Sequence, residues 1–321
     1  MKPLVPRISL VVEWDNPRAT DGSRAHRMLR RVAEQIAETK ISGELILVYD
    51  ELEVRVSVVQ AAADIFEERL AGDFPVKLVA TRGLRYYQLK NEGARHSTGE
   101  IVILVDSDVI PEDGWLEHLV GSFDDPEVQV VNGATYVDLS TLHGKGFGLH
   151  WYMFDPRTAD GPIYAGTDMW ANSLGFRREI IERFPFPRDP ERFRGQCGML
   201  ARTLQANGIV IYQHPMVRVA HPAPPARKFL QWSLCNGHDQ WIRLRRMGDR
   251  RKYGFRGMAR QWLRNLRKAT ITVVRDRSRV DLPLWGVPIT LAIAFAYYTL
   301  VSLGGLIAAW RPGLLRNRYG I

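Results

Sequence analysis

The chain has 321 residues, 45% of them hydrophobic and 25% charged, which is enough apolar content for one large core or two modest ones and excludes a disordered chain. Lys and Arg outnumber Asp and Glu by 44 to 35, a net charge of +9, so nucleic acid, an anionic membrane and phosphate-bearing substrates all fit as partners. Cys197 and Cys235 match neither a zinc nor a disulfide framework, so we expect a reducing compartment, the cytosol.

Residues 1–7 hold one lysine and two prolines and run directly into an apolar strand pattern, so no secretory signal is expected. From there to Val131, short β-branched runs alternate with segments of helical spacing. The runs predict strands at Ile8–Val12, Leu45–Tyr49, Val76–Ala80, Ile101–Val105 and Val128–Val131. The segments between them predict helices at Arg24–Thr39, Val58–Leu70, Tyr86–Thr98 and Trp115–Phe123. Together they predict an α/β fold with a mostly parallel, Rossmann-like sheet flanked by helices.

After Val131 the pattern weakens. A stretch rich in Gly and His, Leu142–Gly148, predicts a loop, and Asp155–Gly166 is polar. Beyond it the sequence predicts strands at Trp170–Phe176 and Ile209–Tyr212 and, between them, a helix at Met199–Ala206 closed by Asn207-Gly208.

The last part of the chain predicts contact with a membrane. Leu282–Trp310 carries no charged residue and is long enough to cross a hydrocarbon core of about 30 Å as a helix, although its prolines and the Gly304-Gly305 pair also fit a re-entrant segment. Before it, Trp241–Arg279 interleaves Arg and Lys with apolar residues, the composition of helices that lie on anionic headgroups. This location accounts for the basic charge, so no nucleic-acid partner is expected.

Acidic residues follow the predicted strands. They are Glu13 and Asp15 after the first, Asp50 after the second, and Asp106 and Asp108 after the fourth. Ligands of such sheets bind beyond the carboxyl ends of the strands. Two carboxylates two residues apart at that edge can hold one hard divalent cation, Mg²⁺ or Mn²⁺, which commonly bridges carboxylates to diphosphate oxygens.

Four sequence motifs contain or accompany these carboxylates. They are Ser9-Leu10-Val11-Val12 in the first strand, Asp50 ending the second, Lys90-Asn91-Glu92-Gly93-Ala94, and Asp106-Ser107-Asp108 followed by Pro111 and Gly114-Trp115-Leu116. With them the chain from Ile8 to His221 resembles the family 2 glycosyltransferases, inverting enzymes of the GT-A fold that carry an Asp-x-Asp motif at a strand end.

The resemblance implies a role for each matching residue. Asp50 would contact the nucleotide base, Glu13 the base or ribose, and Lys90 and Asn91 would lie beside the donor. Asp106 would face the ribose and the metal, and Asp108 would bind the metal that grips the diphosphate. His221 matches a late histidine that can complete the metal coordination, and the role of an ordinary loop residue stays open for it.

The resemblance over Ile8–His221 and the composition of the residues after it together predict the domain organisation. Residues 1–225 would form the GT-A domain, with a nucleotide-sugar half at 1–131 and an acceptor half at 132–225. Basic amphipathic interfacial helices would follow at 226–280, a transmembrane or re-entrant segment at 281–311 and a basic tail at 312–321. The expected partners are a nucleotide diphosphate-sugar donor, a lipid-linked or membrane-proximal glycan acceptor and the cytoplasmic membrane, with the catalytic domain facing the cytosol.

The sequence departs from the family at one catalytic position. Inverting members usually present Glu-Asp at the start of a late helix, where the Asp deprotonates the acceptor, whereas this chain has Gln196-Cys197. Three interpretations follow. Another carboxylate, Asp168 or Glu191, serves as the base, although Asp168 also fits a simple turn residue; the acceptor is a phosphate that needs no base; or the protein is a catalytically inactive nucleotide-sugar-binding membrane protein.

Overall fold

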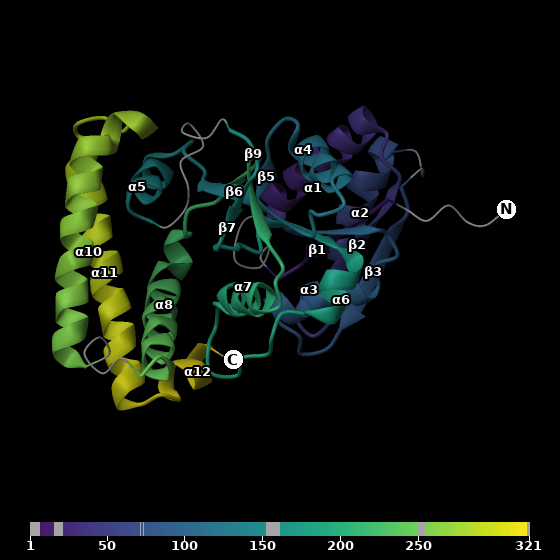
Figure 1. Ribbon diagram of the computed structural model, residues 1–321. Coiled ribbons are helices and arrows are strands. Elements are labelled where there is room, and N and C mark those ends of the chain that lie inside the picture. The colour runs from purple at the N-terminus through teal and green to yellow at the C-terminus, as the bar shows by residue number, and fades with distance from the viewer. Residues whose placement is uncertain are drawn as a thin grey trace. The chain divides into compact units, whose positions relative to one another are not determined.

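The computed structural model describes residues 7–15, 22–70, 72, 74–151, 161–248 and 254–319. The predictions for residues 1–6 and for the first part of the polar stretch, 155–160, lie outside this range. The chain divides into two compact units. The first contains Met1–Tyr136, Asp155–Pro187 and Gln196–His221, and the second contains Val137–Phe154, Arg188–Gly195 and Pro222–Ile321. Figure 1 shows the elements of both units.

A single sheet forms the centre of the first unit, with the strand order β3-β2-β1-β4-β8-β6-β9-β5 and with β7 paired to β9. The strands are β1 Ile8–Glu13, β2 Gly43–Asp50, β3 Val76–Thr81, β4 Ile101–Asp106, β5 Ile110–Pro111, β6 Val130–Val137, β7 Tyr164–Gly166, β8 Ser173–Arg177 and β9 Ile211–His221. The block β3-β2-β1-β4 is parallel, and β8 joins it antiparallel to β4. The predicted α/β sheet with flanking helices is therefore confirmed, with antiparallel strands added in the second half.

Helices cover both faces of the parallel block. They are α1 Gly22–Thr39, α2 Val56–Leu70, α3 Tyr86–Arg95, α4 Trp115–Gly121, α6 Arg178–Arg183 and α7 Gln196–Ala206, with a 3₁₀ turn at Ser122–Asp124. Successive strand residues point to opposite faces, so Leu10 and Val12 pack in a core with α1, α2 and α4, whereas Val11 packs in a core with α3, α6 and α7. Because both faces are covered, every residue of β1, β2 and β4 is buried.

One predicted loop is a helix. Residues Leu142–His150 form α5, whose N-cap Thr141 accepts a 3.0 Å hydrogen bond from the backbone N–H of Gly144. The glycines that suggested a loop serve close packing, because a Cβ at Gly144 would collide with the carbonyl oxygen of Asp138 and one at Gly146 would lie 2.9 Å from the hydroxyl of Thr290. The loop prediction was therefore wrong. The second half also differs in that β8 begins only at Ser173 and β9 runs on from Tyr212 to His221.

Apart from Val137 at the end of β6, the regular elements described in the second unit are helices. Besides α5 it contains α8 Ala226–Arg246, α10 Phe255–Asp276, α11 Gly286–Trp310 and α12 Leu314–Tyr319, with a 3₁₀ turn at Arg277–Val280. In Figure 1 the three long helices α8, α10 and α11 lie lengthwise beside one another, and α11 contacts both of the others. By length and composition alone, α11 is the one helix of the described chain that could cross a membrane.

Candidate active site

Three potential metal ligands converge at the carboxyl edge of the parallel block. Asp106 is the last residue of β4, and Asp108 follows it by two positions. His221 is the last residue of β9, and it reaches the same edge because Ile110 of β5 pairs with Ala220. One side-chain ligand atom from each of the three lies within 4.8 Å of the other two. Asp106, Asp108 and His221 are 2%, 1% and 8% exposed, so the cluster is buried.

These three side chains fit a divalent metal ion. Two carboxylate oxygens and one imidazole nitrogen suit Mg²⁺ or Mn²⁺, with further positions left for substrate oxygens or water. Two buried carboxylates at this separation repel each other unless a cation neutralises them. Glu13 adds to the negative charge, since it pairs in register with Asp106, and burial followed by the nearby Asp106 charge raises its pKa well above the usual value. The cluster could therefore bind a divalent metal, as the sequence predicts.

Three side chains fix the carboxylate of Asp106. One of its oxygens accepts a 2.6 Å hydrogen bond from the hydroxyl of Tyr86 and lies 2.8 Å from the ammonium of Lys90, while the other accepts a 2.7 Å bond from the amide of Asn172. Lys90 is completely buried, so its charge acts in a poorly screened setting. Of the predicted donor residues, Lys90 therefore contacts Asp106 directly. The sequence did not reveal the contacts of Tyr86 and Asn172, because both partners are distant in the chain.

Arg24 of α1 connects the two backbone segments that carry the ligands. Its guanidinium donates one hydrogen bond to the carbonyl oxygen of Asp108 and another, 2.7 Å long, to the carbonyl oxygen of Ala220, next to His221. Sequence reasoning missed this residue. A signal was present, since Arg24 precedes the core residues Met28 and Val32 by four and eight positions and so lies on the apolar face of α1.

The comparisons with known proteins agree with this geometry. Residues 22–184, half of the chain, match the model of the protein family described as glycosyl transferase family 2. The chain belongs to glycosyl transferase family 2. The predicted enzyme class, a glycosyltransferase, is thereby confirmed. No curated protein matches the chain.

Two solved structures resemble this family 2 chain. The mannosyltransferase PcManGT from Pyrobaculum calidifontis, in complex with GDP-Man and Mn²⁺, is 19% identical with a TM-score of 0.53, and the match covers 98% of this chain and 83% of that one. GalNAc-T7 with UDP, GalNAc and Mn²⁺ is 15% identical with a TM-score of 0.51, and the match covers 70% of this chain and 45% of that one. At these identities the likeness shows the fold, which confirms the predicted GT-A type.

Two other predicted donor residues of this family 2 chain make local contacts. Asp50 ends β2 at the same edge of the sheet as Glu13, and its carboxylate accepts a 3.0 Å hydrogen bond from the backbone N–H of Leu52. Asn91 instead points to the segment after α6, where its amide exchanges two 2.9 Å hydrogen bonds with the backbone of Phe186. Asp50 thus closes a turn at the edge of the sheet where Glu13 lies, while Asn91 connects α3 to the segment after α6.

The position of the usual family 2 base lies at the start of α7. The thiol of Cys197 lies 3.5 Å from the hydroxyl of Tyr87, and burial raises its pKa to about 11, so it stays protonated at neutral pH. The side-chain carbonyl oxygen of Gln196 is buried and has no hydrogen-bond partner among the residues that the structure describes. This end of α7 therefore offers an acceptor of hydrogen bonds and no base.

The two alternative carboxylates differ in their surroundings. Asp168 is exposed between β7 and β8, and its backbone carbonyl accepts a 2.8 Å hydrogen bond from Gln213. Glu191 belongs to the second unit, where hydrogen bonds from Arg246 lower its pKa. The carboxylate of Glu191 is held in an ion pair with Arg246, whereas Asp168 is exposed, which favours Asp168 of the two.

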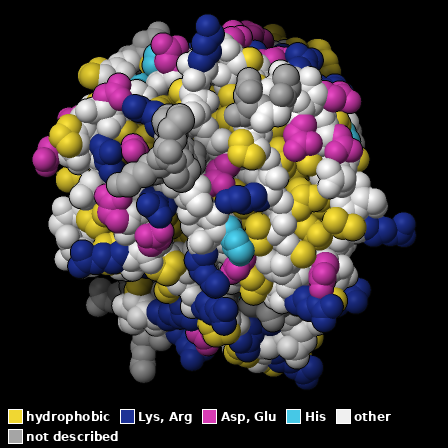
Figure 2. Space-filling model, turned by 90° about the vertical axis from the view of Figure 1, so that its right-hand side faces the viewer, with side chains coloured by type: hydrophobic (Ala, Val, Ile, Leu, Met, Phe, Trp, Pro, Cys, Tyr) yellow, Lys and Arg dark blue, Asp and Glu magenta, His cyan; other side chains and the backbone are white. Residues whose placement is uncertain are grey.

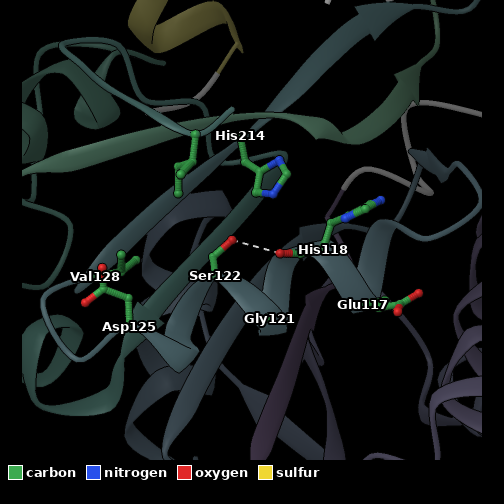
Figure 3. A pocket seen from close by; sticks show the side chains of 8 residues that line it. Glu117, His118, Gly121, Ser122, Asp125, Val128 and His214 are labelled. Atoms are coloured by element: carbon green, nitrogen blue, oxygen red, sulfur yellow. Dashed lines mark hydrogen bonds between the residues drawn. The ribbon is translucent and has the colours of Figure 1, made fainter. Parts of the chain in front are cut away.

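A separate pocket of about 450 Å³ lies between α4 and the first half of β9 (Figure 3). The rings of His118 and His214 are 5.5 Å apart at this pocket, and burial followed by the proximity of His118 lowers the pKa of His214 to about 4. His214 and His221 are seven residues apart on one strand, which corresponds to roughly 23 Å. The pocket is therefore distinct from the metal cluster.

Proposed function

We propose that this protein transfers a sugar from a nucleoside diphosphate-sugar to a lipid-linked or membrane-proximal glycan acceptor, with inversion at the anomeric carbon. The observation that carries the proposal is the buried cluster of Asp106, Asp108 and His221 at the edge of the sheet where β1, β2 and β4 end. Family membership and the fold set the reaction class, and the cluster supplies a place for the diphosphate.

In this proposal each residue has a defined task. Asp106, Asp108 and His221 hold the divalent ion, which, when bound, neutralises the charge that develops on the departing diphosphate. Lys90, Tyr86 and Asn172 hold the Asp106 carboxylate in one orientation, which is the usual function of hydrogen bonds behind a metal ligand. Glu13 and Asp50, at the ends of the neighbouring strands, would contact the ribose and the base, and Asn91 would support the donor side through α3.

We assign activation of the acceptor to Asp168, the exposed carboxylate that precedes β8. A hydroxyl acceptor must lose a proton during attack, and neither Gln196 nor the protonated thiol of Cys197 can take it. An acceptor that is already ionised, such as a lipid phosphate, needs no base at all. Replacement of Asp168 separates the two possibilities, because only a hydroxyl acceptor needs the base.

We further propose that the protein works at the cytoplasmic membrane with its catalytic domain on the cytosolic side. Support comes from the 25-residue apolar helix α11 and from the arginines of the adjacent α10. A membrane location would place a lipid-linked acceptor close to the enzyme.

The proposed function predicts that transfer depends on Asp108. Purified full-length protein is mixed with Mn²⁺, membrane lipids and a panel of radiolabelled nucleoside diphosphate-sugars, and transfer to lipid is counted. Asp108→Asn removes a metal ligand, so we expect at least a 100-fold loss of metal-dependent transfer with little change in melting temperature. The matched control is Asp113→Asn, an exposed aspartate on the same connection, whose side chain is 94% exposed. Full activity of the Asp108 variant would refute the metal assignment.

A second candidate function is supported by Gln196 and Cys197. A protein without a base at the family position could bind a nucleotide-sugar in the membrane without turning it over. In that case the donor with Mn²⁺ would raise the melting temperature, since it binds the native state, but neither transfer nor hydrolysis of the labelled donor would occur with any acceptor. Measurable turnover of any donor would reject this candidate.

A further inference from the structure

Helix α11 has two different apolar faces. The residues of one face are buried within the unit at spacings of three and four: Gly286, Thr290, Ala294, Tyr297, Val301, Gly304 and Ala308. The residues of the opposite face are large and exposed: Trp285, Ile289, Phe295, Leu303 and Trp310. Only the second face is free to contact lipid, so α11 is a one-sided helix rather than one with lipid all around it.

The buried face of α11 packs along the full length of α8. Near one end the rings of Phe229 and Tyr297 are 6.3 Å apart, and near the other Ala308 packs with Trp241. In the middle the backbones nearly touch, since a Cβ at Gly237 would collide with the carbonyl oxygen of Val301. Any depth that residues 297–308 of α11 occupy in a bilayer must therefore be shared by α8.

Helix α8 is unsuited to the bilayer interior. The carboxylate of Asp239, near its middle, accepts hydrogen bonds of 3.0 and 2.7 Å from the backbone N–H groups of Phe193 and Arg194. Arg246, at its end, is paired with Asp189 and Glu191. The irregular segment 188–195 thus lies against α8, and irregular backbone is not tolerated in contact with lipid.

Helix α10 covers another side of α11 and runs antiparallel to it. The indole N–H of Trp262 donates a 3.2 Å hydrogen bond to the hydroxyl of Thr299, and Val273, near the end of α10, packs in one cluster with Leu282 and Leu291. Five exposed basic residues follow along α10: Arg256, Arg260, Arg264, Arg267 and Lys268. If α11 crossed the bilayer, several of these charges would lie at the depth of the hydrocarbon core, where charges are strongly disfavoured.

Apolar residues of α10 and α11 form a shared face around one groove. A groove of about 210 Å³ between the helices is lined by Phe255, Met258, Ala259, Trp262, Thr299, Ser302, Leu303 and Leu306. The basic row of α10 begins beside this groove, since Arg256 and Arg260 directly follow the groove residues Phe255 and Ala259, and the only acidic residue of the two helices is Asp276. In contrast, the face of the molecule in Figure 2 mixes acidic and basic side chains. An apolar face bordered by Arg and Lys is the arrangement of helices that lie in the plane of an anionic membrane surface.

We infer that α10 and α11 lie together in the interfacial plane of an anionic bilayer, with their shared apolar face toward the acyl chains, and that α11 does not cross the membrane. The arginines of α10 then extend sideways to lipid phosphates while their methylene groups stay on apolar surface. The inference rests on the membrane association proposed above, and it leaves the chemistry of the Asp106 site unchanged.

Labelling at the two ends of α11 tests this orientation. Leu284→Cys and Leu314→Cys place thiols at exposed positions on either side of the helix, and Leu52→Cys, on an exposed turn of the first unit, marks the side of the catalytic domain. Sealed right-side-out and inverted membrane vesicles carrying the full chain are treated with a membrane-impermeant maleimide. The unsubstituted chain, whose two cysteines are buried, gives the background.

We expect all three thiols to react in vesicles of the same orientation. If Leu284→Cys and Leu314→Cys react in vesicles of opposite orientation, the helix spans the membrane and the inference is wrong. Recovery of the chain in the soluble fraction would instead refute the membrane association itself. Neither readout requires transferase activity, so the function proposed for the Asp106 site is tested independently.

A charge-reversal series tests the lipid partner. One triple variant combines Arg260→Glu, Arg264→Glu and Arg267→Glu. Its binding is measured to vesicles of phosphatidylcholine alone and to vesicles in which about one lipid in three is phosphatidylglycerol. The basic row predicts at least a 10-fold loss of affinity for anionic vesicles and a weaker dependence on salt. The matched control reverses three exposed arginines of the first unit, Arg27, Arg30 and Arg55. Equal losses in both triple variants, or unchanged binding in the α10 variant, would overturn the assignment of this face.

Discussion

At the scale of single residues, the candidate site depends on partners that are far apart in the sequence. The acidic strand ends were predictable, because an apolar strand followed by Asp-x-Asp is a local pattern. The contacts of Tyr86, Asn172 and Arg24 with the two aspartates span 20, 66 and 84 positions, so no local pattern could reveal them. The sequence therefore predicts which carboxylates could bind a metal ion but not which side chains orient them.

The first prediction at this scale concerns Arg24. Arg24→Lys keeps the charge but loses the planar fork that donates to the carbonyls of Asp108 and Ala220 together. We expect the Mn²⁺ concentration for half-maximal transfer to rise roughly 10-fold, in line with losses at groups behind a metal ligand. Arg27→Lys, on the exposed side of the same helix, is the control. An unchanged Mn²⁺ requirement in Arg24→Lys would show that the segments carrying Asp108 and His221 hold their positions without the hydrogen bonds from Arg24.

The second prediction at this scale concerns Asp168. If it is the base, Asp168→Asn should lower kcat by about 100-fold or more, the usual contribution of a positioned base. The KM for the donor should stay constant, because the ligands assigned to the donor lie at other strand ends. Asp125→Asn, another exposed aspartate of the first unit, is the control. Unchanged rates across the pH range would remove Asp168 from the mechanism and favour an acceptor that is already ionised.

At the scale of elements, the predictions agree with the structure where a segment has one dominant hydrophobic periodicity. Most strands and helices of residues 8–131 lie within a few positions of their predicted bounds, because buried strands and amphipathic helices have clear periodicities. The exceptions are β6, which runs on to Val137, and the short β5, which was not predicted. Helix α5 was missed because its glycines resemble loop signals, although here they allow the helix to contact Asp138 and Thr290. The length of β9 was missed because the consecutive residues Gln213, His214 and Pro215 interrupt its apolar pattern.

The segment between α6 and α7 gives an element-scale prediction. Burial opposes ionisation of Asp189, but hydrogen bonds from Arg246 and Arg192 lower its pKa to about 2, below the ordinary 3.8. A carboxyl whose pKa is lower in the folded state stabilises that state above the ordinary pKa, and this contribution fades as the pH falls from about 4 toward 2. We expect Asp189→Asn to lower the melting temperature at pH 7 and to flatten its fall below pH 4.

The neighbouring carboxylate provides the matched control. Glu191 pairs with the same Arg246 but its side chain is 42% exposed, so Glu191→Gln should change the melting temperature much less. Equal effects of the two substitutions would mean that burial of Asp189 adds nothing to its ion pairs.

At the scale of the whole molecule, the proposed function assigns different tasks to the two units. Every residue assigned to the metal and the donor belongs to the first unit, whereas the apolar and basic faces assigned to the membrane belong to the second. Sequence composition predicts membrane contact for the last helices, which stays a prediction. It could not predict their orientation, because length and hydropathy describe α11 alone, while the orientation follows from α8 and α10 packed against it.

The last prediction therefore concerns the contact between α8 and α11. In Gly237→Ala the new methyl group would meet the backbone of Val301, which cannot move unless the helices separate, so we expect a loss of about 1–3 kcal/mol in stability. Gly121→Ala, where the structure offers open space, is the control. Donor with Mn²⁺ should still raise the melting temperature of both variants by similar amounts, because its ligands lie in the first unit. A Gly237→Ala protein as stable as the parent would mean that α11 can leave α8, and the argument that both must share one depth in the membrane would lose its foundation.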